Sequence, residues 1–219
     1  MKPQLVIFDY DGLMVDSEEF SFISYHDYLT RFGIDMTREA YFGTYLGMSL
    51  KDTLEKFEED YNISFDVQEA MEICVQVEIE CLTTIGAPMR KGLLELLDYL
   101  EENGYRKCIA TSSVLNRCMV TLKRHHIEDR FDSMTVATDV KKAKPNPDIF
   151  LVACKKEGVD PGEALVLEDS ESGVEAAVAA GIPVICIPGL KQPDERHRKM
   201  ATKVMDSLLD VIDYLEEMK

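Results

Sequence analysis

Two carboxylates stand two residues apart near the start of the chain, where an apolar run ends. Asp9 and Asp11 follow the segment LVIF and flank Tyr10 before Gly12. Like charges this close make each other harder to ionise, so the pair needs either full solvation or a cation. A carboxylate can attack phosphorus to form an aspartyl-phosphate, while a second one exchanges protons with the leaving oxygen and with water. The pair is therefore a candidate for phosphoryl transfer, with a solvated strand end as the simpler interpretation.

Three more polar clusters follow apolar runs later in the chain. Thr111, Ser112 and Ser113 end or follow the run 107–111, Lys144 precedes a Pro-Asn-Pro turn, and Glu168 and Asp169 close the run 164–168. If these runs are parallel strands, their carboxyl ends meet at one edge of the sheet, where open α/β sheets bind ligands. Carboxylates, hydroxyls, a lysine and helix N-termini at that edge suit a hard divalent cation and a phosphate group.

The chemistry of each group indicates a division of roles. One carboxylate from each of two strands, Asp9 and Asp169, can bind Mg²⁺, and Mn²⁺ and Co²⁺ are alternatives because they also accept oxygen ligands. Asp9 is the candidate nucleophile and Asp11 the candidate acid and base. Thr111 and Lys144 can hold the phosphate oxygens as charge shifts. The alternatives are helix caps at the hydroxyl and carboxylate clusters and a surface charge at the lysine.

The spacing of apolar residues predicts the elements that must position these groups. Short apolar runs predict buried strands, and apolar residues three and four apart predict helices. The predicted strands are residues 4–9, 107–111, 134–138, 164–168 and 183–187; the predicted helices are residues 22–32, 37–42 (ended by Gly43), 50–61, 67–81, 93–100, 114–126, 148–157, 170–181 and 207–218. From residue 89 on, helices and strands alternate, which is typical of a parallel sheet with helices on both faces.

The predicted fold class is α/β, with a doubly wound parallel sheet and an inserted helical domain. The first strand has no partner near it in the sequence, so we expect it to join the later strands. Residues 1–15 and 88–219 should form a Rossmann-like catalytic core, and residues 16–87 a helical bundle inserted into it.

The charge composition limits the kinds of partner that the protein can bind. With 24 basic against 41 acidic residues, the net charge of −17 would repel nucleic acid and anionic membrane surfaces, so neither is expected as a partner. A phosphorylated substrate then needs local positive charge from a lysine, a metal or helix N-termini. The six cysteines form no C-x-x-C pair, and the apolar run near the start of the chain already meets charge at Asp9, which favours a reducing, cytoplasmic location. The four histidines are expected on the surface.

Taken in order, these motifs resemble those of the haloacid dehalogenase-like hydrolase superfamily, in the branch with a helical cap after the first motif. The residues that carry the resemblance are DYDG (9–12), TSS (111–113), KPNPDIF (144–150) and EDSESGVEAAVAAG (168–181). They match the nucleophile, phosphate-binding, lysine and acidic metal motifs of that superfamily, over nearly the whole chain. Residues 16–87 would then be the cap, and Mg²⁺ the cofactor.

The resemblance also implies a role for each matching position. Asp9 would be the nucleophile and a metal ligand. Asp11 would be the acid and base and, through its backbone carbonyl, a second ligand, while Asp169 would be the third, with Glu168 beside it. The groups expected to hold phosphate are Thr111, Ser112 and Lys144, and the loop residues expected to contact substrate, if they are more than a turn between helices, are Gly47, Met48 and Ser49.

The carboxylate at position 11 favours phosphoryl transfer, because dehalogenases of this superfamily lack it there. The expected function is Mg²⁺-dependent hydrolysis of a small phosphorylated metabolite, phosphosugar-like or nucleotide-like, through an aspartyl-phosphate. A phosphomutase resembling beta-phosphoglucomutase is the first alternative, but Ser21, Leu50 and Val114 stand where that enzyme carries His, Arg and Lys. A non-catalytic binding module is the second, although it would have no physical need to gather this much charge at one edge.

Overall fold

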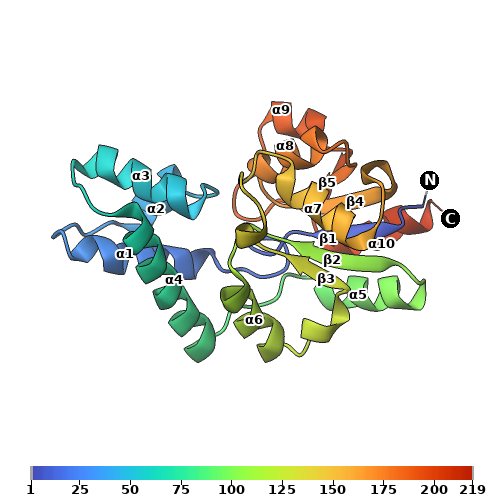
Figure 1. The fold of residues 1–219 in the computed structure, drawn as a ribbon, viewed down its shortest axis with the longest axis horizontal. Coiled ribbons are helices and arrows are strands. Elements are labelled where there is room, and N and C mark those ends of the chain that lie inside the picture. The colour runs from blue at the N-terminus through green and yellow to red at the C-terminus, as the bar shows by residue number, and fades with distance from the viewer. Residues whose placement is uncertain (1, 219) are drawn as a thin grey trace. The chain divides into compact units, whose positions relative to one another are not determined.

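The structure is a computed structural model that describes residues 2–218 and consists of two compact units. One unit comprises the chain up to Asp16 and from Pro88 onward, and the other comprises Ser17–Ala87. The first contains the sheet and is called the core unit below. The second is entirely helical within the described residues and is called the helical unit. Figure 1 shows the elements of each unit.

The core unit is built on one parallel sheet of six strands within the described residues, in the order β3-β2-β1-β4-β5-β6. The strands are β1 (Leu5–Phe8), β2 (Arg106–Ala110), β3 (Ser133–Thr135), β4 (Ala164–Glu168), β5 (Val184–Cys186) and β6 (Lys203–Val204). The first strand along the chain pairs with β2 on one side and β4 on the other. The strand order therefore reverses at β1, and the switch point of a doubly wound sheet is where ligands bind.

Helices cover the two faces of this sheet. They are α5 (Leu93–Glu102), α6 (Leu115–Arg124), α7 (Asp148–Glu157), α8 (Glu171–Ala179), α9 (Glu195–Met200) and α10 (Leu208–Glu216), with single turns of 3₁₀ helix at Glu128–Arg130, Ala137–Asp139 and Pro161–Glu163. Figure 1 shows α7 and α5 on opposite sides of the sheet. Phe150 of α7 and Val174 of α8 pack against Ile7 and Val166 in one buried cluster. The central strands β1, β4 and β5 are buried along their whole length, which is why they read as continuous apolar runs.

The helical unit contains α1 (Glu18–Thr30), α2 (Arg38–Thr44), α3 (Leu50–Tyr61) and α4 (Val67–Thr84). Its core is aromatic: the Tyr25 and Phe57 rings meet edge to face with centroids 5.5 Å apart. The side chains of Thr37, Ser49 and Asp66 each accept an N–H three residues further on, at the starts of α2, α3 and α4. These N-caps satisfy backbone donors that the helix itself cannot.

The predicted fold class is confirmed, and four of the local differences are described here. The strand predicted at 134–138 ends at Thr135, because residues 137–139 turn into 3₁₀ helix. Helix α2 continues through Gly43 to Thr44. Residues 195–204, where no element is predicted, form α9 and the edge strand β6. The expected surface position of His197 is wrong: the side chain is buried, and its ring nitrogens lie 2.7 Å from Asp194 Oδ1 and 3.1 Å from Glu175 Oε1.

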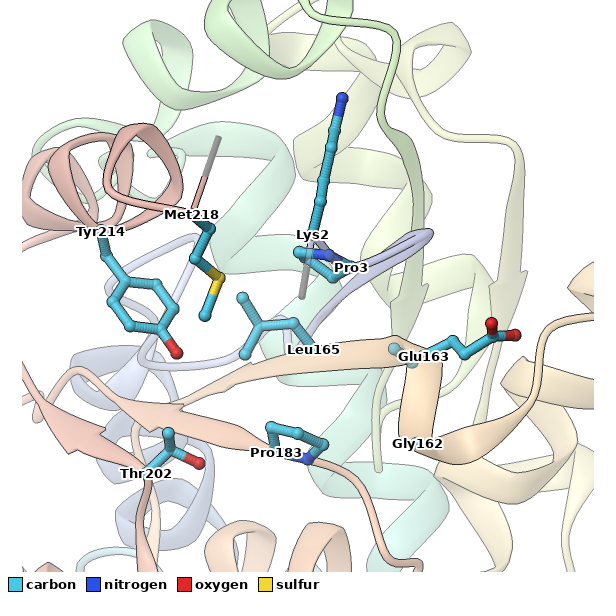
Figure 2. Close-up of a pocket in the computed structure, with 10 residues that line it drawn as sticks. Lys2, Pro3, Gly162, Glu163, Leu165, Pro183, Thr202, Tyr214 and Met218 are labelled. Atoms are coloured by element: carbon cyan, nitrogen blue, oxygen red, sulfur yellow. The ribbon is translucent and has the colours of Figure 1, made fainter.

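The cavity in Figure 2 lies at the amino ends of the strands, away from the polar clusters. It has a volume of about 250 Å³ and is lined by residues that precede or begin β1, β4 and β5, among them Pro3, Leu165 and Pro183. Tyr214 and Met218 of the carboxyl-terminal segment complete it. Ligands of open parallel sheets bind at the opposite, carboxyl edge, so this cavity is not the candidate active site.

None of the described helices is both long and apolar enough to cross a bilayer. All six cysteines are free, and five of them are buried.

We expect the native thiols to react slowly, with one exception. Burial raises the pKa of Cys154 to about 11 and that of Cys186 to about 12, so little of either thiol is ionised at pH 8. Burial also limits the access of reagents to these two thiols. Cys81 is only partly buried. A thiol-reactive dye at pH 8 should therefore label Cys81 first, and Cys81→Ser should remove this fast phase while Cys154→Ser keeps it. A fast phase that survives in Cys81→Ser would contradict this assignment.

Candidate active site

β1 carries Asp9 to the carboxyl edge of the sheet at the switch point. The backbone N–H of Asp9 donates to the Leu167 carbonyl at 3.0 Å, so pairing with β4 continues one residue past the strand. Tyr10 is fully buried, whereas the Asp9 residue keeps 6% of its surface exposed and the Asp11 side chain 30%. The carboxylates, rather than the ring between them, thus lie at the edge where the chain leaves the sheet.

Lys144 places its ammonium between two buried carboxylates. Its Nζ donates to Asp9 Oδ1 at 2.6 Å and to Glu168 Oε1. Burial alone would lower the pKa of Lys144, but the charges of Asp9 and Glu168 raise it above its ordinary value. Burial raises the pKa of Asp9 to about 8, although Lys144 opposes that shift. The ammonium is therefore charged, and the Asp9 carboxylate needs positive charge beside it to ionise fully.

Glu168 is the most constrained carboxylate of the site. It is completely buried, and its Oε2 accepts from the Ser170 backbone N–H at 2.8 Å and from the Ser170 hydroxyl at 2.9 Å. Ser170 also caps α8 by accepting from the Gly173 N–H at 3.1 Å. The start of α8 and the lysine thus hold Glu168 from two sides. This places Glu168 within the charged centre.

Asp169 lies against the turn that follows the first strand. A Cβ placed on Gly12 would lie 2.0 Å from Asp169 Oδ2, and Gly12 also has a φ of +78°. Only glycine meets both conditions without displacing the neighbouring carboxylate. Gly189, in the loop after β5, comes close to the same carboxylate, with Asp169 Oδ2 3.2 Å from a Cβ placed there. The glycine in the DYDG motif therefore allows the first and fourth strand ends to approach each other.

The carboxylates of Asp9, Glu168 and Asp169 could hold a metal ion. One ligand oxygen from each lies within 4.8 Å of the others. All are hard carboxylate donors, which suits Mg²⁺. Together with Asp11 the site holds four carboxylates against the two cations Lys144 and Arg117, so full ionisation of all four would leave an excess of two negative charges. A divalent cation fits this donor set in both chemistry and charge.

The hydroxyl cluster after β2 lies beside Asp11. Thr111 is buried, and its Oγ1 accepts from the Ser113 N–H at 3.0 Å. The Ser113 hydroxyl donates to Asp11 Oδ2 at 2.5 Å. Ser112 is exposed. The structure thus brings the strand ends of β1 and β2 together through Ser113, the last residue of the TSS motif, for which no separate role is predicted from the sequence.

Arg117 is the site residue that sequence reasoning missed. Its Nη1 donates to Asp11 Oδ1 at 2.7 Å and to Oδ2 at 2.9 Å, and only 5% of its side chain is exposed. Its position could have marked it as a site residue. Arg117 is a basic residue in the first turn of a helix that begins at the carboxyl edge of the sheet. Acidic residues are the usual choice there.

The loop residues 47–49 belong to the helical unit. Gly47 has a φ of +79°, Met48 packs against the aromatic core, and Ser49 caps α3 by accepting from the Asp52 N–H at 3.1 Å. A turn between two helices is therefore enough to explain the residue types at these three positions. Contact with a substrate stays a prediction.

We expect Gly173→Ala to destabilise the core unit by about 2 kcal/mol, because the added methyl overpacks the site. A Cβ there would lie 1.8 Å from Glu168 Oε1, whose carboxylate is held on both sides. Alanine in a helix is otherwise the more favourable residue. Gly162→Ala is the control in the same unit, since its Cβ would meet nothing within 4 Å. Urea unfolding of both variants tests this, and equal midpoints would contradict it.

Comparison with known proteins points to one family. A family model described as haloacid dehalogenase-like hydrolase matches residues 6–187. A phosphorylated carbohydrates phosphatase of Thermotoga maritima is 30% identical over 179 residues, covering 82% of each chain. Hexitol phosphatase B of Escherichia coli is 27% identical over 207 residues, covering 94% of this chain and 92% of that one.

Solved structures show the same fold. The crystal structure of CbbY from Rhodobacter sphaeroides in complex with phosphate superimposes with a TM-score of 0.85. The alignment covers 95% of this chain and 96% of that one, at 23% sequence identity. At that identity the likeness is evidence of shared architecture alone.

Proposed function

The chain belongs to the haloacid dehalogenase-like hydrolase family, and from that premise we propose that it is a Mg²⁺-dependent phosphatase of small phosphorylated metabolites. Asp9 is the nucleophile, and the reaction passes through an aspartyl-phosphate. One observation carries the proposal: Lys144, Asp9 and Glu168 form a buried charged centre at the switch point of the sheet, with Asp169 and Asp11 beside it. The names of the two phosphatase relatives support the substrate class.

In the first step an Asp9 carboxylate oxygen forms a bond to phosphorus as the bond from phosphorus to the alcohol oxygen breaks. Asp11 gives its proton to that oxygen, so the product leaves as a neutral alcohol. Lys144 and the hydroxyl and N–H groups after β2, including Thr111 and Ser112, hold the equatorial oxygens, where negative charge must be stabilised.

In the second step Asp11 takes a proton from a water molecule that attacks phosphorus. The bond from phosphorus to Asp9 breaks, which releases inorganic phosphate and regenerates the free Asp9 carboxylate. Mg²⁺ would be held by Asp9, Asp169 and the Asp11 backbone carbonyl, with Glu168 beside them, and when bound it supplies positive charge to the phosphoryl oxygens. Splitting the hydrolysis in two lets one carboxylate serve as acid and then as base.

We also propose that the helical unit is the cap of this family and that residues 47–49 contribute to substrate choice. A reducing, cytoplasmic location fits the free state of all six cysteines. The net charge of −17 disfavours nucleic acid and anionic membranes as partners.

The test is phosphate release from a panel of phosphomonoesters, including sugar phosphates and nucleotides, with Mg²⁺ and with EDTA. We expect Mg²⁺-dependent release from at least one ester, with water as the acceptor. A mutase would instead need a bisphosphate activator and return the phosphoryl group to a second hydroxyl of the sugar. Folded, Mg²⁺-loaded protein that releases no phosphate from any ester would count against the proposal.

A further inference from the structure

Arg117 makes its contacts inside the candidate site rather than at its surface. One nitrogen, Nη1, donates to both oxygens of Asp11 at 2.7 and 2.9 Å and lies 2.9 Å from the Ser113 hydroxyl. Ser113 in turn donates to Asp11 Oδ2. Arg117, Ser113 and Asp11 therefore form a closed triangle of charge-assisted hydrogen bonds, which are stronger than neutral ones and fix geometry.

The placement of Arg117 works against local helix stability. It is the third residue of α6, and Lys123 and Arg124 already provide the basic residues of the last turn. A cation in the first turn opposes the helix dipole. Burying a guanidinium costs further free energy unless a carboxylate compensates it. Asp11 provides that compensation, so the two residues require each other.

Arg117 is poorly placed to bind a substrate phosphate itself. Its Nη1 already contacts both carboxylate oxygens of Asp11 and the Ser113 hydroxyl, and its side chain is 5% exposed, against 30% for Asp11. The exposed partner of the pair is thus the carboxylate. A carboxylate oxygen has two lone pairs. Asp11 Oδ2 accepts from both Ser113 and Arg117, whereas Oδ1 accepts from Arg117, so Oδ1 is the oxygen through which Asp11 can exchange a proton while the arginine and the serine hold the carboxylate.

We propose that Arg117 is a positioning residue for proton transfer: with Ser113 it fixes the Asp11 carboxylate in the orientation that serves the leaving oxygen and the attacking water. This inference rests on the proposed phosphatase function. Without the arginine, Asp11 gains rotational freedom and the site loses the alignment that makes a positioned acid effective.

Two phosphomonoesters that differ in their leaving group test this role. An alkyl phosphate needs protonation of its leaving oxygen, whereas nitrophenolate leaves without it. In Arg117→Met we expect kcat/KM for the alkyl ester to fall about 10²-fold and kcat/KM for nitrophenyl phosphate to fall less than about tenfold, because kcat/KM reports the first chemical step. The inhibition constant of inorganic phosphate should not change.

Three comparisons complete the experiment. Arg117→Lys should recover part of the loss, because it restores the charge without the fork of donors. Arg124→Met, exposed in the same helix, should leave both esters unaffected. In an Asp11→Asn background, Arg117→Met should cost little more, since the group that it positions is already gone.

The outcomes separate this inference from the proposed function. Equal losses on both esters, or full additivity with Asp11→Asn, would mean a structural role and overturn the inference. A rise in the phosphate inhibition constant that matches the fall in kcat/KM would make Arg117 a phosphate ligand and overturn it as well. A wild-type chain inactive on every ester overturns the proposed function and this inference with it, while an active wild type with an unimpaired Arg117→Met variant overturns the inference alone.

Discussion

Replacing Asp9 by Asn is expected to lower Mg²⁺-dependent phosphate release by on the order of 10⁴-fold or more, because the amide cannot act as the nucleophile. The substitution keeps the shape of the side chain. The fold should survive, since burial raises the pKa of Asp9 and the carboxylate resists ionisation where it stands. Neutralising it therefore removes an unfavourable charge rather than a needed one.

Matched measurements make the Asp9 result interpretable. Asp160→Asn, at an exposed position of the same unit, is the control and should behave as wild type. Circular dichroism and thermal melting should show Asp9→Asn to be folded and at least as stable as wild type in EDTA. Substantial turnover by the folded variant would mean that another group attacks phosphorus.

Replacing Lys144 by Met is expected to damage stability and catalysis together. The variant leaves Asp9 and Glu168 buried, with 8% and 0% of their side chains exposed, without their shared cation. Removing one partner of a buried ion pair costs about 3–5 kcal/mol. Activity should fall by about 10²–10³-fold, because a charge that stabilises the phosphoryl oxygens is lost.

A second substitution separates the two effects of Lys144. In EDTA, Lys144→Met/Glu168→Gln should recover part of the lost stability, because it removes one uncompensated charge, yet activity should not return. Lys142→Met, at an exposed position two residues away, is the control for loss of a lysine. If Lys144→Met unfolds at the same urea concentration as wild type, the buried centre is not held together as described.

Much of this site is predictable because the carboxyl ends of parallel strands lie at the same edge of the sheet. Residues that follow strands predicted from local patterns are therefore expected to lie together. Asp9, Lys144 and Glu168 are far apart in sequence, yet Asp9 directly follows β1, Glu168 ends β4, and Lys144 lies in the segment that joins β3 to α7. Strand order at a switch point then brings them within hydrogen-bonding distance. Local patterns carry this information because β1 and β4, whose ends hold Asp9 and Glu168, are continuous buried apolar runs.

The features that sequence reasoning missed depend on long-range pairing. Arg117 reads as an ordinary basic residue until Asp11, 106 positions earlier, is placed beside it. His197 reads as a surface residue until Glu175 of α8 lies at 3.1 Å from its ring. The strand β6 is two residues long and forms only where β5 offers an open edge. None of these three features produces a hydrophobic periodicity from which it could be predicted.

Trapping the covalent intermediate on Asp9 tests the central claim most directly. Wild-type protein with Mg²⁺ would be mixed with an active phosphomonoester labelled in the phosphoryl group and quenched in acid. The labelled site would then be identified by peptide mass spectrometry after borohydride reduction, which converts a phosphoaspartate to homoserine. In wild type we predict acid-stable label on the protein before reduction and, after reduction has released that label, homoserine at residue 9; Asp9→Asn should show neither. Phosphate release without label on the protein, or homoserine at another residue, would contradict the aspartyl-phosphate mechanism proposed for this site.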